Sequence, residues 1–239
     1  MFLFPKPLKH AAVVESKKTL NSKVVEFVFK LTSPPEIAFL PGQFINLKVG
    51  ETCFRSYSIS SDAGIKDSIS ILAAVDHDGI GSNYLKNLSV GQEITFIGPS
   101  GRFILPELLA ESLVFIATGT GIAPILSMLS SLSHSKCESA IKVYFGVKVC
   151  EEIFKKDILD KMASELPNFS YEICISREQA TEKNTKQGRV TNFIEIQREN
   201  TQYLICGHPD MVQDTLNMLV ENGIPANNIF HEMFTVSIK

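Results

Sequence analysis

The chain has 239 residues, of which 44% are hydrophobic and 21% are charged, and its formal net charge is −3. This length suggests one large domain or two small ones. The slight negative charge gives no general attraction to nucleic acid or to anionic membrane surfaces, so we expect neither as a partner. No apolar run approaches the roughly 20 residues that a membrane-spanning helix needs, so we expect no membrane insertion.

The cysteines are widely scattered and include no C-x-x-C pair, which argues against zinc and iron–sulfur sites, and we expect no bound metal. The first residues, MFLFPKPLKH, are too short and too broken by proline for a signal peptide. An odd number of cysteines without a secretion signal favours reduced thiols and a cytoplasmic location. The cysteines are Cys53, Cys137, Cys150, Cys174 and Cys206.

From residue 9 to residue 98 the sequence consists of short apolar runs separated by turn residues. The runs are rich in β-branched and aromatic residues, which is typical of strands. Six such strands with one short helical candidate, residues 82–88, predict a small antiparallel β-barrel or sandwich. The expected strands are residues 10–14, 24–29, 44–49, 55–60, 68–75 and 93–98.

From about residue 112 apolar strands alternate with helical patterns, which predicts βαβ units and an α/β domain with a doubly wound parallel sheet. We therefore place a hinge at residues 106–110 and expect two domains, residues 1–107 and residues 108–239. The polar stretch 179–188 is expected to be a surface loop. The expected strands are residues 112–117, 140–147, 169–176, 201–206 and 227–234, and the expected helices are residues 122–132, 155–166, 190–197 and 209–222.

A glycine-rich turn, TGTGIAP, follows the first strand of the second domain and opens a helix. Gly119 and Gly121 leave backbone amides uncovered there, and Pro124 removes a donor that would lack a partner at that position anyway. Such a turn favours a phosphate group, although it is neither a P-loop nor a complete G-x-G-x-x-G. By itself the turn is equally compatible with a purely structural role.

A second turn, CGHPDM at residues 206–211, ends another strand in the same way. In a sheet of order 3-2-1-4-5, strands 1 and 4 are neighbours at the switch point, where such folds bind nucleotides. The turn after Thr118 ends strand 1 and the turn at Cys206 ends strand 4. The two turns are therefore expected to face one crevice.

Ser176 and Arg177 follow the third strand of this domain. A hydroxyl beside a guanidinium suits an isolated phosphate, whereas an NAD site more often places an acidic residue on the ribose. Lys183 and Arg189 are close enough in sequence to contribute. The alternative is that Arg177 is a solvated loop residue.

Seven stretches of the sequence, taken together and in order, resemble the ferredoxin–NADP reductase family over nearly the whole chain. They are RSYSIS (55–60), GIGSNYL (79–85), GPSGRF (98–103), TGTGIAP (118–124), SRE (176–178), CGHPDM (206–211) and HEMF (231–234). The resemblance implies a flavin-binding β-barrel joined to an NADP-binding α/β domain, with FAD rather than FMN and NADP(H) as cofactors.

For the flavin, the resemblance implies that Arg55 pairs with the pyrophosphate, that Tyr57 lies against the isoalloxazine face and that Ser58 reaches the reactive nitrogen region. Residues 79–82 would hold the same pyrophosphate with backbone amides at a helix N-terminus. Residues 73–75 match the segment whose backbone runs along the flavin edge. The implied flavin-binding residues are Arg55, Tyr57, Ser58, Ala73, Val75, Gly79, Gly81, Ser82 and Phe234.

For the nicotinamide nucleotide, the resemblance places the Cys206 thiol near the reacting ring, although a free cysteine is often only a buried apolar residue. Glu232 would assist proton transfer, so Ser58, Cys206 and Glu232 are the expected catalytic residues. Plant-type members end at the aromatic residue, whereas TVSIK follows Phe234 here. The expected nucleotide-binding residues are Thr118, Gly119, Gly121, Pro124, Ser176, Arg177 and Gly207.

The resemblance implies an enzyme that passes electrons between NADPH and a one-electron carrier such as ferredoxin or flavodoxin, with another redox protein as a possible partner. Two alternatives stay open. One is a free-flavin reductase or the reductase component of an oxygenase. The other is a non-enzymatic electron-transfer subunit of a larger complex.

Overall fold

The computed structural model describes residues 4–234. The chain folds into two compact units. The first unit holds the residues up to 107 together with residues 123–134, and the second holds residues 108–122 and 135 onward. Within each unit a separate hydrophobic cluster fills the interior. Among the described residues, no helix is long and apolar enough to cross a membrane.

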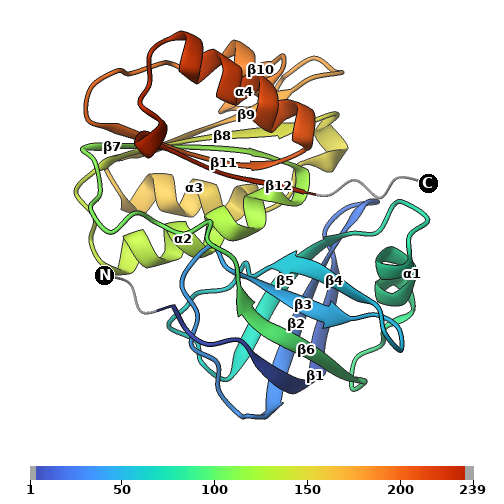
Figure 1. The fold of residues 1–239 in the computed structure, drawn as a ribbon. Coiled ribbons are helices and arrows are strands. Elements are labelled where there is room, and N and C mark those ends of the chain that lie inside the picture. The colour runs from blue at the N-terminus through green and yellow to red at the C-terminus, as the bar shows by residue number, and fades with distance from the viewer. Residues whose placement is uncertain (1–3, 235–239) are drawn as a thin grey trace. The chain divides into compact units, whose positions relative to one another are not determined.

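The first unit is a six-stranded antiparallel sheet with the strand order β4-β3-β6-β1-β2-β5 (Figure 1). Its two edge strands approach each other, because Ile59 bridges to Ile71 and the Ser60 amide donates to the Ser70 carbonyl at 2.8 Å. The sheet is therefore a nearly closed barrel, as the sequence predicts. The strands are β1 (Leu8–Thr19), β2 (Val24–Ser33), β3 (Phe44–Lys48), β4 (Phe54–Ser58), β5 (Ser68–Ala74) and β6 (Glu93–Ser100).

Alternation of apolar and polar residues builds the barrel interior, because successive side chains of a strand point to opposite faces. In β2 the side chains of Phe27 and Phe29 are fully buried, and Phe96 of β6 is buried with them. The helix α1 (Ile80–Asn87) lies between β5 and β6 in the chain, and its Leu85 is part of the same core.

The second unit is a parallel sheet with the order β10-β9-β8-β7-β11-β12. Taken without β10, this is the expected order 3-2-1-4-5. The short strand β10 lies in the stretch 179–188, which the sequence predicts as a loop. The strands are β7 (Ser112–Thr118), β8 (Ala140–Val147), β9 (Phe169–Ile175), β10 (Thr185–Gln187), β11 (Thr201–Gly207) and β12 (Ile229–Met233).

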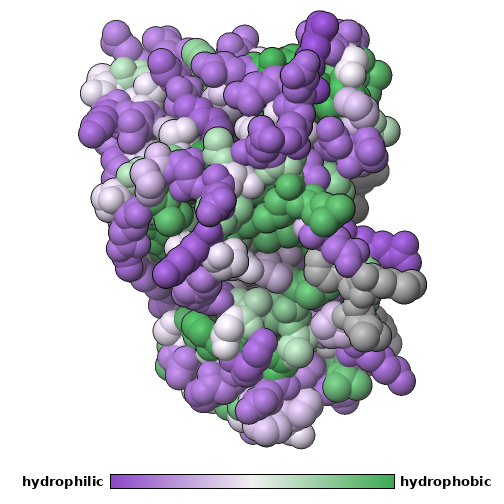
Figure 2. Space-filling view, turned by 90° about the vertical axis from the view of Figure 1, so that its left-hand side faces the viewer, coloured by the Kyte–Doolittle hydropathy of each residue, from purple (hydrophilic) through white to green (hydrophobic). Residues whose placement is uncertain are grey.

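Helices follow the strands of the second sheet as the sequence predicts: α2 (Ile122–His134) after β7, α3 (Lys156–Glu165) after β8 and α4 (Pro209–Glu221) after β11. Met211, Val212 and Leu219 of α4 belong to the core of this unit. Hydrophilic side chains cover much of its surface on the face drawn in Figure 2, where it is the upper part of the picture.

The expected helix at residues 190–197 is wrong beyond its first turn. Only residues Val190–Asn192 form a 3₁₀ turn. Downstream, tyrosine hydroxyls satisfy backbone groups that a helix would otherwise pair: the Glu195 amide donates to Tyr144 Oη at 3.3 Å and the Gln197 amide to Tyr203 Oη at 2.8 Å. Both tyrosines come from strands of the sheet, so tertiary contacts outweigh the local helical pattern here.

Candidate functional site

In the barrel, Arg55 and Tyr57 occupy alternate positions of β4 and therefore share a face of the sheet. The first turn of α1 packs directly against them. A methyl group at Gly81 would lie 2.6 Å from Tyr57 Oη, closer than such atoms normally approach, and 3.0 Å from Arg55 Cγ, which is a tight contact. A glycine at residue 81 therefore allows this close approach of the α1 backbone, and a larger residue would require one of these side chains to shift.

The N-terminus of α1 carries a polar atom that has no partner among residues 4–234. Ser82 is 3% exposed, and its Oγ makes no hydrogen bond there. The N-cap residue is Gly79, no side chain caps the helix, and its first turn holds no acidic residue. Backbone N–H groups at a helix N-terminus and a buried, unpartnered hydroxyl together suit an anionic ligand.

The guanidinium of Arg55 is exposed and lies along its own strand. Its Nη1 donates to the Phe54 carbonyl at 2.8 Å and to Cys53 Sγ at 3.2 Å, and within the described residues it pairs with no carboxylate. The positive charge of Arg55 is therefore available to attract an anion. The sequence gives no signal that Cys53 contacts Arg55. Burial raises the pKa of Tyr57 to about 12, although the nearby Arg55 charge opposes the shift.

The other predicted flavin residues of the barrel lie in less open positions. Ser58 is 6% exposed, at the end of β4. Ala73 is buried in the core of the barrel, so only the backbone of this part of β5 could face a ligand. Val75 is half-buried, and its amide donates to the Lys23 carbonyl at 2.7 Å.

In the second unit, the two predicted turns lie side by side, because β7 and β11 are adjacent parallel strands. A methyl group at Gly121 would lie 2.3 Å from the Cys206 carbonyl oxygen and 2.7 Å from Gly207 Cα. Gly207 has a φ of +146° and abuts Thr118. The structure thus brings Thr118, Gly121 and Gly207 together at the carboxyl edge of the sheet.

Thr118 links these two turns by a hydrogen bond. Its Oγ1 accepts from the His208 amide at 3.0 Å, so the hydroxyl fixes the start of α4 and does not cap the turn at Gly119–Gly121. Gly119 adopts a φ of +54°, which favours glycine. Pro124 stands in the first turn of α2.

Cys206 is fully buried at the end of β11. Burial raises the pKa of its thiol well above the ordinary value, and the Glu232 carboxylate raises it further. Glu232 is the register partner of Cys206 on β12. Phe234 is half-buried, and its amide donates to the Gly207 carbonyl at 3.1 Å. The residues TVSIK that follow lie outside the described residues.

Ser176 and Arg177 are both exposed and follow β9 on the carboxyl edge of the same sheet. The Ser176 amide donates to the Val147 carbonyl at 3.1 Å and the Arg177 amide to the Lys148 carbonyl at 2.9 Å. The carboxylate of the neighbouring Glu178 accepts from the Cys150 amide at 2.8 Å. The backbone is therefore tied to the loop after β8, while the Arg177 side chain is exposed.

Two family models cover most of the chain. Residues 11–104 match the oxidoreductase FAD-binding domain, and residues 115–217 match the oxidoreductase NAD-binding domain. In the part of the chain that the structure describes, no group of three or more His, Cys, Asp or Glu side chains could hold a metal ion.

Two relatives with similar sequences are named as electron transfer components of dioxygenases. The chain is 31% identical over 234 residues to the toluate 1,2-dioxygenase electron transfer component of Pseudomonas putida, which covers 95% of this chain and 68% of that protein. It is 30% identical over 208 residues to the anthranilate 1,2-dioxygenase electron transfer component of Acinetobacter baylyi. This match covers 84% of this chain and 60% of that protein. The chain thus spans about two thirds of the length of these relatives.

Solved structures share the fold across both units. A cytochrome P450 reductase from Amycolatopsis superimposes with a TM-score of 0.88 at 21% identity, covering 97% of this chain and 71% of that one. A ferredoxin NADP⁺ reductase from Neisseria gonorrhoeae, with bound FAD and NADP, superimposes with a TM-score of 0.79 at 23% identity. This match covers 96% of this chain and 99% of that one.

A barrel that matches an FAD-binding model and a parallel sheet that matches an NAD-binding model define a flavin- and nicotinamide-dependent oxidoreductase. Within that class, the chain belongs to the ferredoxin–NADP reductase family. FAD and a nicotinamide dinucleotide are accordingly its cofactors. This confirms the fold, the family and the cofactors that the sequence predicts, whereas the roles of individual residues stay predictions.

Proposed function

We propose that the protein takes electrons from NADPH through FAD and delivers them to a separate one-electron carrier protein, such as a ferredoxin or a flavodoxin. The observation that carries the proposal is a closely packed, glycine-dependent turn in each of the units matched by the FAD-binding and NAD-binding models. One is the first turn of α1 against Arg55 and Tyr57. The other is the turn pair at Gly121 and Gly207.

The donor groups of the barrel site suit FAD. The Arg55 guanidinium, the unpartnered Ser82 hydroxyl and the amides after Gly79 would bind the pyrophosphate. Tyr57 offers an aromatic face for ring stacking, and burial keeps its hydroxyl protonated and able to donate. Ser58 and the backbone at Ala73 and Val75 would contact the ring system.

Bound FAD supplies the step that lets a two-electron donor serve one-electron acceptors. The task of this chain is to bind and orient the two cofactors. Thr118, Gly119, Gly121, Pro124 and Gly207 would form the nucleotide turn pair, and the missing Cβ of Gly121 lets the two turns pack against each other.

Three further residues complete the proposed chemistry. The Cys206 thiol would lie beside the reacting nicotinamide, and its raised pKa keeps it neutral there. Glu232, its register partner on β12, would assist proton transfer near the same edge. Phe234 would contribute an aromatic ring to flavin binding.

Ser176 and Arg177 are proposed to give the protein its specificity for NADPH. NADPH differs from NADH by one phosphate, which a guanidinium and a hydroxyl bind well. Glu178 could otherwise bind the ribose of NADH, but its carboxylate is already hydrogen-bonded to the Cys150 amide.

A second candidate is the reductase component of an oxygenase. The names of the toluate and anthranilate dioxygenase relatives favour it, since both are electron transfer components. In that case the acceptor is an oxygenase or its ferredoxin.

An acceptor panel tests these proposals. NADPH and NADH oxidation would be measured with ferredoxin, flavodoxin, a ferredoxin-dependent oxygenase, ferricyanide and free flavin as acceptors. We expect rapid NADPH-dependent reduction of ferredoxin or flavodoxin. Oxygenase reduction alone would establish the second candidate. Activity with free flavin alone, by a protein that loses FAD on gel filtration, would establish a free-flavin reductase. Failure with every acceptor would indicate a subunit that works only in a complex.

A further inference from the structure

The C-terminal end of α1 is held by a lysine that lies about 70 residues earlier in the chain. Lys17 of β1 donates from Nζ to the Lys86 carbonyl at 2.7 Å and to the Leu88 carbonyl at 2.8 Å. The last carbonyls of a helix have no partner within the helix, and a cation at this end also interacts favourably with the helix dipole. Lys17 therefore ties the end of α1 to the wall of the barrel.

Lys17 is itself well placed to act as an anchor. It pairs with Phe27 across the β1–β2 ladder, and its Nζ lies 5.7 Å from the centre of the Phe27 ring. Phe27 is fully buried in the barrel core. The lysine stem thus rests on a rigid part of the barrel while its ammonium group reaches the helix.

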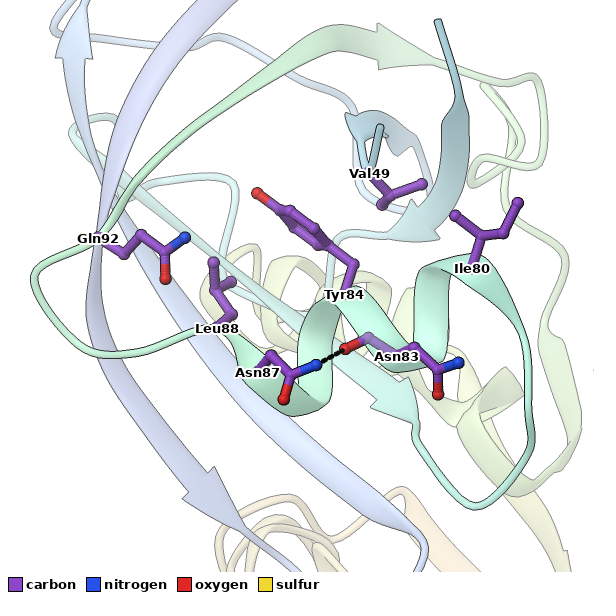
Figure 3. A pocket seen from close by; sticks show the side chains of 7 residues that line it. All are labelled: Val49, Ile80, Asn83, Tyr84, Asn87, Leu88 and Gln92. Carbon is purple, nitrogen blue, oxygen red and sulfur yellow. Dashed lines mark hydrogen bonds between the residues drawn. The ribbon is translucent and has the colours of Figure 1, made fainter. Parts of the chain in front are cut away.

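The outer face of α1 is exposed at Ile80, Asn83 and Asn87. A pocket of about 450 Å³ borders that face (Figure 3). On its other face, Gly81, Ser82 and Leu85 are buried. The pocket is lined by Val49, Ile80, Asn83, Tyr84, Asn87, Leu88 and Gln92.

The opposite end of α1 carries the first turn that packs against Arg55 and Tyr57. An eight-residue helix is about 12 Å long, so a shift at its C-terminus moves its N-terminus as a rigid body. We propose that Lys17 is a positioning residue for the flavin pyrophosphate, which it serves by fixing the direction of α1. This inference rests on the proposed FAD site at the N-terminus of that helix.

The experiment compares binding of FAD with binding of riboflavin, which lacks the phosphates. Lys17→Met keeps the stem on Phe27 but removes both hydrogen bonds. We expect its Kd for FAD to rise about three- to tenfold, as for the loss of a cation at a helix end, with the Kd for riboflavin unchanged. Lys17→Arg should restore FAD binding, because a guanidinium can donate to both carbonyls. Flavin-depleted protein and fluorescence titration give the constants.

Lys18→Met is the matched control, since Lys18 is an exposed neighbour on the same strand. Equal FAD affinity in Lys17→Met and Lys18→Met would overturn the inference, as would an equal loss of FAD and riboflavin binding. If Lys17→Met does not fold by circular dichroism, Lys17→Gln is judged by the same criteria. A wild-type protein that binds FAD no better than riboflavin would instead contradict the proposed pyrophosphate site itself.

Discussion

Arg177 is the charged side chain that, together with Ser176, is proposed to select NADPH over NADH. Wild type should have a higher kcat/KM with NADPH than with NADH. Arg177→Ala should lower the NADPH value by about 10- to 100-fold, because one charged contact is worth roughly 1.5–3 kcal/mol. The value for NADH should hardly change. Steady-state kinetics with both cofactors measure this.

Arg198→Ala is a suitable control, because Arg198 is exposed and lies outside the predicted site. Equal efficiencies of the wild type with both cofactors would contradict the predicted preference. A similar loss with NADH in Arg177→Ala would show that the arginine serves something other than the phosphate.

A substitution of Cys206 tests the proposed contact between its thiol and the nicotinamide ring. The side chain is fully buried and its pKa is raised, so near neutral pH it acts as a neutral thiol. Cys206→Ser should slow flavin reduction by NADPH more than it weakens NADPH binding, because the proposed contact is with the reacting ring. Stopped-flow absorbance separates the rate from the Kd.

Cys174→Ser is the matched control for that substitution. Cys174 is also fully buried, burial raises its pKa to about 12, and it lies on β9 away from the turn pair. If Cys206→Ser keeps the wild-type rate and affinity, or resembles Cys174→Ser, then Cys206 only fills the core.

At the scale of elements, the close contact between α1 and β4 depends on Gly81. A methyl group there would push into Tyr57 Oη and Arg55 Cγ. Gly81→Ala should reduce FAD affinity at least about tenfold and cost about 1–3 kcal/mol of unfolding free energy, as overpacking does. Unchanged FAD titrations for Gly81→Ala would contradict the proposed cradle.

We expect a buried histidine of the strand β1 to make the stability of the barrel sensitive to acid. His10 is 2% exposed and stacks on Phe96 of β6, with ring centres 5.0 Å apart. Burial lowers the pKa of His10 below its usual 6.5, so the unfolded chain binds this proton more readily than the folded one. The stabilising contribution is therefore complete above pH 6.5 and is lost as the pH falls towards the lowered pKa.

His10→Asn should flatten this acid loss of stability. One proton contributes at most about 1.4 kcal/mol per pH unit to the slope of the unfolding free energy. Urea unfolding between pH 7 and pH 5 would measure the slope, with His231→Asn at an exposed position as the control. An identical slope for His10→Asn and wild type would show that His10 does not titrate in this range.

At the scale of the whole molecule, two units with separate cores should respond to different ligands. FAD at about 100 times its Kd should stabilise the barrel by about 2.7 kcal/mol, and NADP⁺ should act on the second unit. Calorimetry of the flavin-depleted chain should show each ligand raising a different part of the unfolding transition. Riboflavin at the same concentration should shift it less than FAD. A transition that FAD leaves unchanged would contradict the assignment of the barrel.

The sequence by itself determined the two-part architecture, the strand order of the second sheet and the family. Strand patterns of period two and alternating strand–helix patterns are local, so the residues near each position encode them. The turns TGTGIAP and CGHPDM could be placed next to each other from topology alone, and the structure confirms that contact through Gly121 and Cys206.

Only the tertiary structure decided the features that join distant residues. The residues after Val190 have a helical pattern, but the hydroxyls of Tyr144 and Tyr203 bind their amides instead. Likewise, Lys17 gives no sequence signal of its contact with the end of α1, and Glu178 gives none of its bond to the Cys150 amide. Such bonds depend on how strands align in space, and the free energy that selects them comes from packing across the sheet rather than from neighbouring residues.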